Sequence, residues 1–152
     1  MPMSFDEIVK LGLAKEKNSE AFYRQWADCM KCPEDIWSRA KVLLLSLASE
    51  EQKHQEVFAK IKAADLSMSG EGSLAMNPES YKVSADITND AKTKEVIAMA
   101  IVREEASMRF YRDLAELGGD MRGVFANLAE QEKRHKERLE NFLNEHVLLD
   151  YE

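Results

Sequence analysis

The chain has 152 residues, a formal net charge of −7 and an apolar fraction of 45%. This length suits one domain, which we assign to residues 1–152. The acidic balance argues against nucleic-acid binding and offers no basic patch to a membrane surface. Apolar runs stay well below the roughly 18 residues of a membrane span, and the N-terminus has no secretory pattern, so a soluble cytoplasmic protein is expected.

A first helix is predicted over about residues 5–31. Ser4 and Glu7 have the spacing of a capping box, in which each side chain accepts a hydrogen bond from the other residue's backbone N–H. Steps of three and four residues trace one core-facing stripe, and Glu16 lies at its centre. A bare carboxylate in a core is costly unless another group pairs with it, so Glu16 is a candidate functional residue.

Cys29 and Cys32 form a single C-x-x-C pair near the end of this helix. A zinc or iron–sulfur centre needs about four such ligands, and the pair lies roughly 20 Å from Glu16 along a helix. Two interpretations stay open, namely ordinary reduced thiols and a redox pair through which electrons enter.

A second helix is predicted over about residues 33–65, with Pro33 at its first position. Its core-facing stripe holds Glu51 and His54, which form a Glu-x-x-His motif. Residues three apart lie on the same face of a helix, so the carboxylate and the imidazole are directed at the same place.

The next residues, 66 to about 91, lose the helical period. A loop of this length is uncommon in a compact domain, and a crossover that runs back along a helical bundle would explain it. We expect such a crossover, with a short strand or turn near residues 81–83. The alternative is a disordered linker.

The third and fourth helices are predicted over about residues 91–117 and 120–146, with Asp120 as the cap of the fourth. Glu104 lies on the stripe of the third helix, and the fourth repeats Glu-x-x-His as Glu132 and His135. The motif E-x-x-S-x-x-F-Y starts at Glu16 and again at Glu104. We therefore predict an all-α four-helix bundle, made from two duplicated helical hairpins with a long crossover between the second and third helices.

Six ionisable groups are predicted to share one layer of this core, because their distances from the hairpin turns are similar. Four carboxylates would balance two divalent ions, and mixed oxygen and nitrogen ligands suit iron or manganese. Glu51 and Glu132 would bridge the two metals. A metal-free network of ion pairs is disfavoured, since these stripes hold no lysine or arginine. The predicted ligands are Glu16, Glu51, His54, Glu104, Glu132 and His135.

The four motifs resemble those of the rubrerythrin di-iron domain, within the ferritin-like superfamily, over essentially the whole chain. The matching segments are residues 16–23, 51–54, 104–111 and 132–135. The resemblance implies a ferritin-like bundle, two iron ions held by the six residues, a homodimer and a role against oxidative stress. It also implies that Tyr23 and Tyr111 hydrogen-bond ligand carboxylates; the alternative is that both are core aromatics. Manganese or a mixed-metal centre stays open.

Two departures from rubrerythrin bear on the function. Ser107 occupies a position where that family has an additional glutamate, and Glu20 and Glu105 lie nearby but off the core stripe. A rubredoxin-like centre with two C-x-x-C pairs is not found in these 152 residues, so a separate electron-donor protein is expected. We expect an oxidoreductase that reduces hydrogen peroxide or reacts with dioxygen. The alternatives are a non-enzymatic iron-binding or iron-handling protein and a manganese site with catalase-like chemistry.

Overall fold

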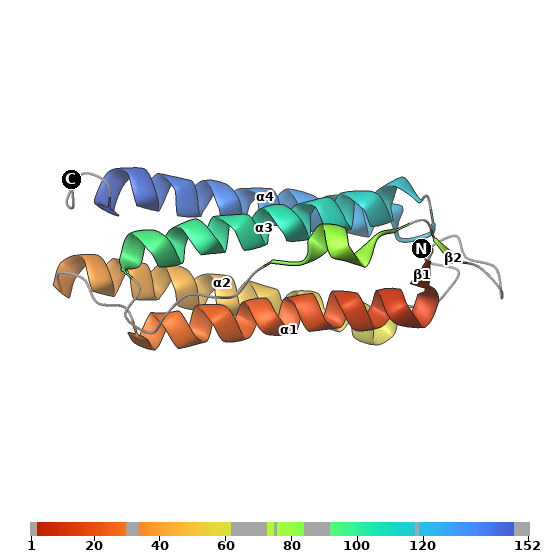
Figure 1. Ribbon diagram of the computed structural model, residues 1–152, viewed down its shortest axis with the longest axis horizontal. Coiled ribbons are helices and arrows are strands. Elements are labelled where there is room, and N and C mark those ends of the chain that lie inside the picture. Colours follow the sequence, from red (N-terminus) through yellow and green to blue (C-terminus); the bar gives the residue numbers. More distant parts are fainter. Residues whose placement is uncertain are drawn as a thin grey trace.

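Four long helices dominate the computed structural model, which describes residues 3–29, 34–61, 73–74, 76–83, 92–117 and 119–147. They are α1 (Phe5–Cys29), α2 (Glu34–Lys60), α3 (Thr93–Glu116) and α4 (Arg122–Phe142), and a π-helical segment, η3 (Leu143–Val147), continues α4. α1 packs along α2, α3 packs along α4, and the two hairpins lie side by side (Figure 1). The prediction of an all-α four-helix bundle is confirmed.

The connection between α2 and α3 must span the bundle, because α2 ends beside the start of α1 whereas α3 begins at the opposite end (Figure 1). Along it, the two-residue strand β2 (Ser73–Leu74) pairs antiparallel with β1 (Met3–Ser4), and the 3-10 helix η2 (Pro78–Tyr81) lies against α3. The predicted crossover is therefore confirmed. The strand or turn expected near residues 81–83 is instead the end of η2, and the described strand lies earlier, at residues 73–74.

Two limits of the predicted helices differ from the structure. α2 ends at Lys60, whereas the prediction extended it to about residue 65; residues 62–65 lie outside the described part. Asp120 does not cap α4, since Met121 occupies the N-cap position without a side-chain hydrogen bond. The Arg122 N–H instead bonds the carbonyl of Gly119 at 3.1 Å, so backbone groups close this turn and the helix begins two residues later.

The start of α1 is fixed by two local features. The capping box is present, with Ser4 N–H 3.3 Å from Glu7 Oε1 and Glu7 N–H 3.2 Å from Ser4 Oγ. Further along, Gly12 permits close contact with α2, because a Cβ at this position would lie 2.3 Å from the nearest ring carbon of Phe58. The absence of a side chain at Gly12 therefore sets how closely the first hairpin can pack.

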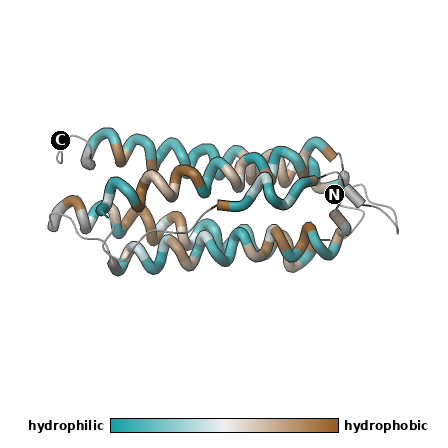
Figure 2. Tube along the Cα trace, in the orientation of Figure 1, coloured by the Kyte–Doolittle hydropathy of each residue, from teal (hydrophilic) through white to brown (hydrophobic). Residues whose placement is uncertain are grey.

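Apolar side chains of the predicted stripes form two core clusters, one on each side of the charged layer. One cluster includes Tyr23, Leu47 and Leu139, and the other includes Phe58 and Leu128. Figure 2 shows hydrophilic and hydrophobic residues interleaved along all four helices, as expected for amphipathic helices in a bundle. In the described part of the chain, no helix combines the length and the apolar character needed to cross a membrane.

Candidate metal centre

The six predicted ligand residues come together in one buried layer between the two apolar clusters. Each is at most 3% exposed. α1 and α3 each contribute one glutamate, and α2 and α4 each contribute a Glu-x-x-His pair. Because each hairpin is antiparallel and its ligands are similarly distant from its turn, the groups reach the same height in the bundle. The residues brought together are Glu16, Glu51, His54, Glu104, Glu132 and His135.

Their ligand atoms form two overlapping groups. One group combines Glu16, Glu51, His54 and Glu132, and in it all four ligand atoms lie within 4.8 Å of one another. The other group meets the same distance limit and contains Glu51, Glu104, Glu132 and His135. Glu51 and Glu132 belong to both groups, whereas every other residue belongs to one. Two adjacent metal ions that share two carboxylates would use the side chains in this way.

Both histidines direct Nδ1 into the cluster. His54 Nδ1 lies 3.0 Å from Glu132 Oε1 and 3.5 Å from Glu16 Oε2. His135 Nδ1 lies 3.0 Å from Glu51 Oε1 and 3.5 Å from Glu104 Oε1. The two imidazole rings are nearly parallel, with centroids 6.1 Å apart. Nδ1 is thus the nitrogen of each ring that is placed to bind a metal.

The outer nitrogen of each ring faces a residue that the sequence analysis missed. His54 Nε2 shares a 2.8 Å hydrogen bond with Gln131 Oε1, and His135 Nε2 lies at ion-pair distance, 3.1 Å, from Glu50 Oε2 without hydrogen-bond geometry. Arg138 in turn holds Glu50 through a 3.1 Å contact between Nη1 and Oε2. Such outer partners fix the tautomer and orientation of a ligating histidine. One signal could have identified them, since each directly precedes the glutamate of a Glu-x-x-His motif.

The two tyrosines connect the hairpins through the glutamates of the opposite half. The O–H of Tyr23, on α1, donates to Glu104 Oε1, and the O–H of Tyr111, on α3, donates to Glu16 Oε1. Burial and the neighbouring carboxylates raise the pKa of both phenols well above the ordinary value, so both keep their protons and act as donors. They therefore orient the two glutamates that are not shared between the groups.

The electrostatics of the layer indicate a need for positive charge. Burial and then repulsion from neighbouring carboxylates raise the pKa of Glu51 and Glu132 well above the glutamate value. Burial also raises the pKa of Glu16, but its close contacts with Glu51, His54 and Tyr111 lower it overall. Burial lowers the pKa of His54, yet the carboxylates of Glu132 and Glu16, 3.0 and 3.5 Å from Nδ1, raise it to about 11. Protons thus supply positive charge to this layer when no metal ion does.

The unpaired atoms of the cluster fit a metal ion. Among the described residues, six inward-facing ligand atoms are buried without a hydrogen-bond partner of suitable geometry. Buried carboxylate oxygens in that condition are costly, and two divalent ions would balance four carboxylates while satisfying these atoms. The atoms are Glu16 Oε2, Glu51 Oε2, Glu104 Oε2, Glu132 Oε1, Glu132 Oε2 and His54 Nδ1.

The remaining candidates from the sequence lie outside the cluster. Glu20 bonds Arg24 at 2.8 Å and Gln55 at 2.7 Å, and Glu105 pairs with Lys136 at 2.8 Å. Neither glutamate belongs to either ligand group, and Ser107 is buried on its stripe. The side chain of Cys29, and Cys32 altogether, lie outside the described residues.

Comparisons with known proteins agree with this fold. A family model described as Rubrerythrin matches residues 7–143. The chain is also similar to a solved structure titled "A Dodecameric Thioferritin in the Bacterial Domain, Characterization of the Bacterioferritin-Related Protein from Bacteroides fragilis", with a TM-score of 0.74 and 14% identity over 98% of this chain and 91% of that one. At this identity the likeness shows the ferritin-like fold alone. No curated protein matches. Since the family match covers most of its residues, the chain belongs to the rubrerythrin family.

Proposed function

We propose that this protein is a cytoplasmic di-iron oxidoreductase that reduces hydrogen peroxide with electrons from a separate donor protein. The observation that carries the proposal is the pair of overlapping ligand groups, which share Glu51 and Glu132. Shared carboxylates are the means by which ferritin-like bundles hold two metal ions close together. Membership of the rubrerythrin family favours iron. Manganese or a mixed centre is the second choice, because ligand type alone does not separate these metals.

The proposed ligand roles follow from the two groups. Shared carboxylates would hold both ions, and each ion would also have one unshared glutamate and one Nδ1 nitrogen. The shared pair is Glu51 and Glu132, the first unshared set is Glu16 with His54, and the second is Glu104 with His135. Tyr23 and Tyr111 would keep the unshared carboxylates oriented.

When bound, two ferrous ions supply the two electrons that convert hydrogen peroxide and two protons into two molecules of water. The chain's own contribution is to orient the ligands and to exclude bulk water, since every ligand residue is at most 3% exposed. The donor protein must return two electrons after each turnover. Cys29 and Cys32 are candidates for electron entry, because they form the only C-x-x-C pair of the 152 residues.

The second candidate function is iron handling without continuous turnover. It is favoured by the likeness to a protein described as a thioferritin and as bacterioferritin-related. That protein is also described as dodecameric, whereas a homodimer is our proposal for this chain. Sedimentation velocity of the full chain distinguishes a dimer from a dodecamer.

The deciding experiment is stopped-flow absorbance of anaerobically iron-loaded protein, mixed with hydrogen peroxide and, separately, with oxygen. The peroxidase proposal expects two irons per chain, and faster oxidation by peroxide than by oxygen. It also expects repeated turnover once a chemical reductant is supplied. Faster oxidation by oxygen, with iron accumulating beyond two per chain, would favour iron handling. Failure to bind iron stoichiometrically would refute both candidates.

A further inference from the structure

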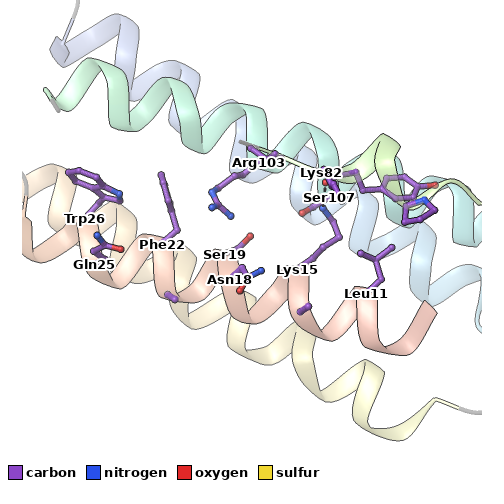
Figure 3. A pocket seen from close by; sticks show the side chains of 15 residues that line it. Leu11, Lys15, Asn18, Ser19, Phe22, Gln25, Trp26, Lys82, Arg103 and Ser107 are labelled. Carbon is purple, nitrogen blue, oxygen red and sulfur yellow. Dashed lines mark hydrogen bonds between the residues drawn. The ribbon is translucent and has the colours of Figure 1, made fainter. Parts of the chain in front are cut away.

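A groove of about 530 Å³ lies between α1 and α3, beside the candidate metal centre. Ser19 and Ser107 line its buried side, and each follows an unshared glutamate of the cluster by three residues. Figure 3 shows Arg103 reaching from α3 toward α1, and Lys15 reaching from α1 toward Ser107. Ligand pockets commonly enclose about 300–1,000 Å³, so a small organic molecule would fit.

Two of the three cations that line the groove, Arg103 and Lys15, have unused hydrogen-bonding capacity, whereas Lys82 pairs with Glu79 at 2.8 Å. Arg103 Nε is buried and has no hydrogen-bond partner within the described residues, and the guanidinium carbon lies 4.5 Å from the centroid of the Phe22 ring. Lys15 Nζ donates to the Tyr81 carbonyl at 3.1 Å, which occupies one of its three protons. Both cations directly precede an unshared glutamate, so the two halves of the chain place a positive charge at equivalent positions.

The lining of the groove combines positive charge with apolar side chains and, in the described residues, contains no carboxylate. No aspartate or glutamate is among the described residues that line it, although the whole chain has a net charge of −7. Its apolar walls include Leu11, Phe22, Trp26 and Val83. A guanidinium ion and an ammonium ion that line one groove together with aromatic walls suit a ligand with one anionic end and one apolar end.

We propose that this groove binds a small amphipathic carboxylate, whose carboxylate lies between Arg103 and Lys15 and whose hydrocarbon part contacts Phe22 and Trp26. The site is distinct from the six residues of the metal centre. Binding does not depend on the reaction proposed above, because the lining cations and aromatic rings make the contacts.

The test is isothermal titration of the full-length protein with octanoate. Two matched molecules serve as controls: octanol, which lacks the charge, and octylamine, which reverses it. We expect one octanoate per chain with a Kd below about 1 mM, and binding of both controls weaker by about tenfold or more. Equal binding of octanoate and octylamine would overturn the proposal, as would a lack of measurable octanoate binding.

Three variants locate the site. Arg103→Gln should weaken octanoate binding about tenfold or more, whereas the exposed Arg122→Gln should leave it unchanged. Ala21→Trp keeps both cations and tests the groove itself, because Ala21 is exposed and lines it, so an indole there should block octanoate. Undiminished binding in Ala21→Trp would overturn the proposal. The proposal would also be overturned if the parent protein did not bind octanoate and Ala21→Trp changed the assembly state. The groove would then be a contact between copies of the chain.

Discussion

Replacing shared and unshared glutamates should have different effects on metal stoichiometry. Glu16 belongs to one ligand group, whereas Glu51 belongs to both. Glu16→Gln should therefore leave one tightly held metal ion per chain. Glu51→Gln should weaken both positions, although the two amides are the same size as the acids they replace. Helical content should stay unchanged in both variants, because the apolar clusters on either side of the layer are untouched.

The expected magnitude follows from the charge balance of the layer. Two divalent ions balance four buried carboxylates, so each neutral amide leaves one positive charge uncompensated. Removing one partner of a buried charge pair costs about 3–5 kcal/mol. Since about 1.4 kcal/mol corresponds to a tenfold change in Kd, affinity should fall roughly 100- to 4,000-fold at each affected position.

The assay is anaerobic titration with ferrous or cobaltous ion, followed by gel filtration and elemental analysis of the protein fraction. Glu105→Gln is the matched control, because Glu105 neighbours a cluster glutamate on α3 but pairs with Lys136. It should retain two ions per chain. A Glu51→Gln variant that keeps one tight site, with Glu16→Gln losing both, would refute the reasoning from shared ligands.

Three further predictions concern the supports of the cluster. Glu50→Gln should lower metal affinity by about tenfold or more, measured by competition with a chelator, because a carboxylate behind a ligating imidazole orients it and increases its basicity. Gly12→Ala should lower the free energy of unfolding by about 1–3 kcal/mol in urea titrations, because the new Cβ would overlap the Phe58 ring. Gly123→Ala, with open space around it, should instead be neutral or stabilise by up to about 1 kcal/mol. The stability of metal-free protein should fall as pH rises from 6.5 toward 8. The reason for the fall is that folding raises the pKa of His54 from 6.5 to about 11. The stabilising contribution of protonated His54 is therefore complete below pH 6.5 and is lost as pH rises toward 11. Above about pH 8, Lys15, whose pKa burial lowers to about 8, begins to add stability with rising pH and so opposes this loss. Chelator-treated samples that gain stability between pH 6.5 and 8 would contradict the assignment to His54.

The sequence predicted the helical faces well because burial follows a fixed period. The α2 stripe through Leu47, Glu51, His54 and Phe58 is buried throughout, as the three-and-four spacing required. The spacing also placed the six ionisable residues in one layer. Helix limits were harder to predict, since the start of α4 depends on backbone bonds in its preceding turn rather than on Asp120.

The outer contacts of the cluster depend on how the hairpins are paired, which periodicity does not specify. Gln131 lies off the stripe of its helix, and its relation to His54 of the other hairpin requires a three-dimensional arrangement. The crossed tyrosines illustrate the same limit. Each tyrosine follows a glutamate of its own helix by seven residues, but each hydroxyl donates to the glutamate of the other half.

These crossed contacts imply that metal binding and association of the hairpins are coupled. Tyr23 to Glu104, Tyr111 to Glu16, His54 to Gln131 and Arg138 to Glu50 all join the first hairpin to the second. The same seam holds four buried carboxylates, two from each hairpin, which repel one another unless protons or metal ions intervene. Two shared metal ions would convert that repulsion into attraction across the seam. Metal ions that bind the folded state alone stabilise it by mass action, so part of their binding energy would hold the two halves of the bundle together.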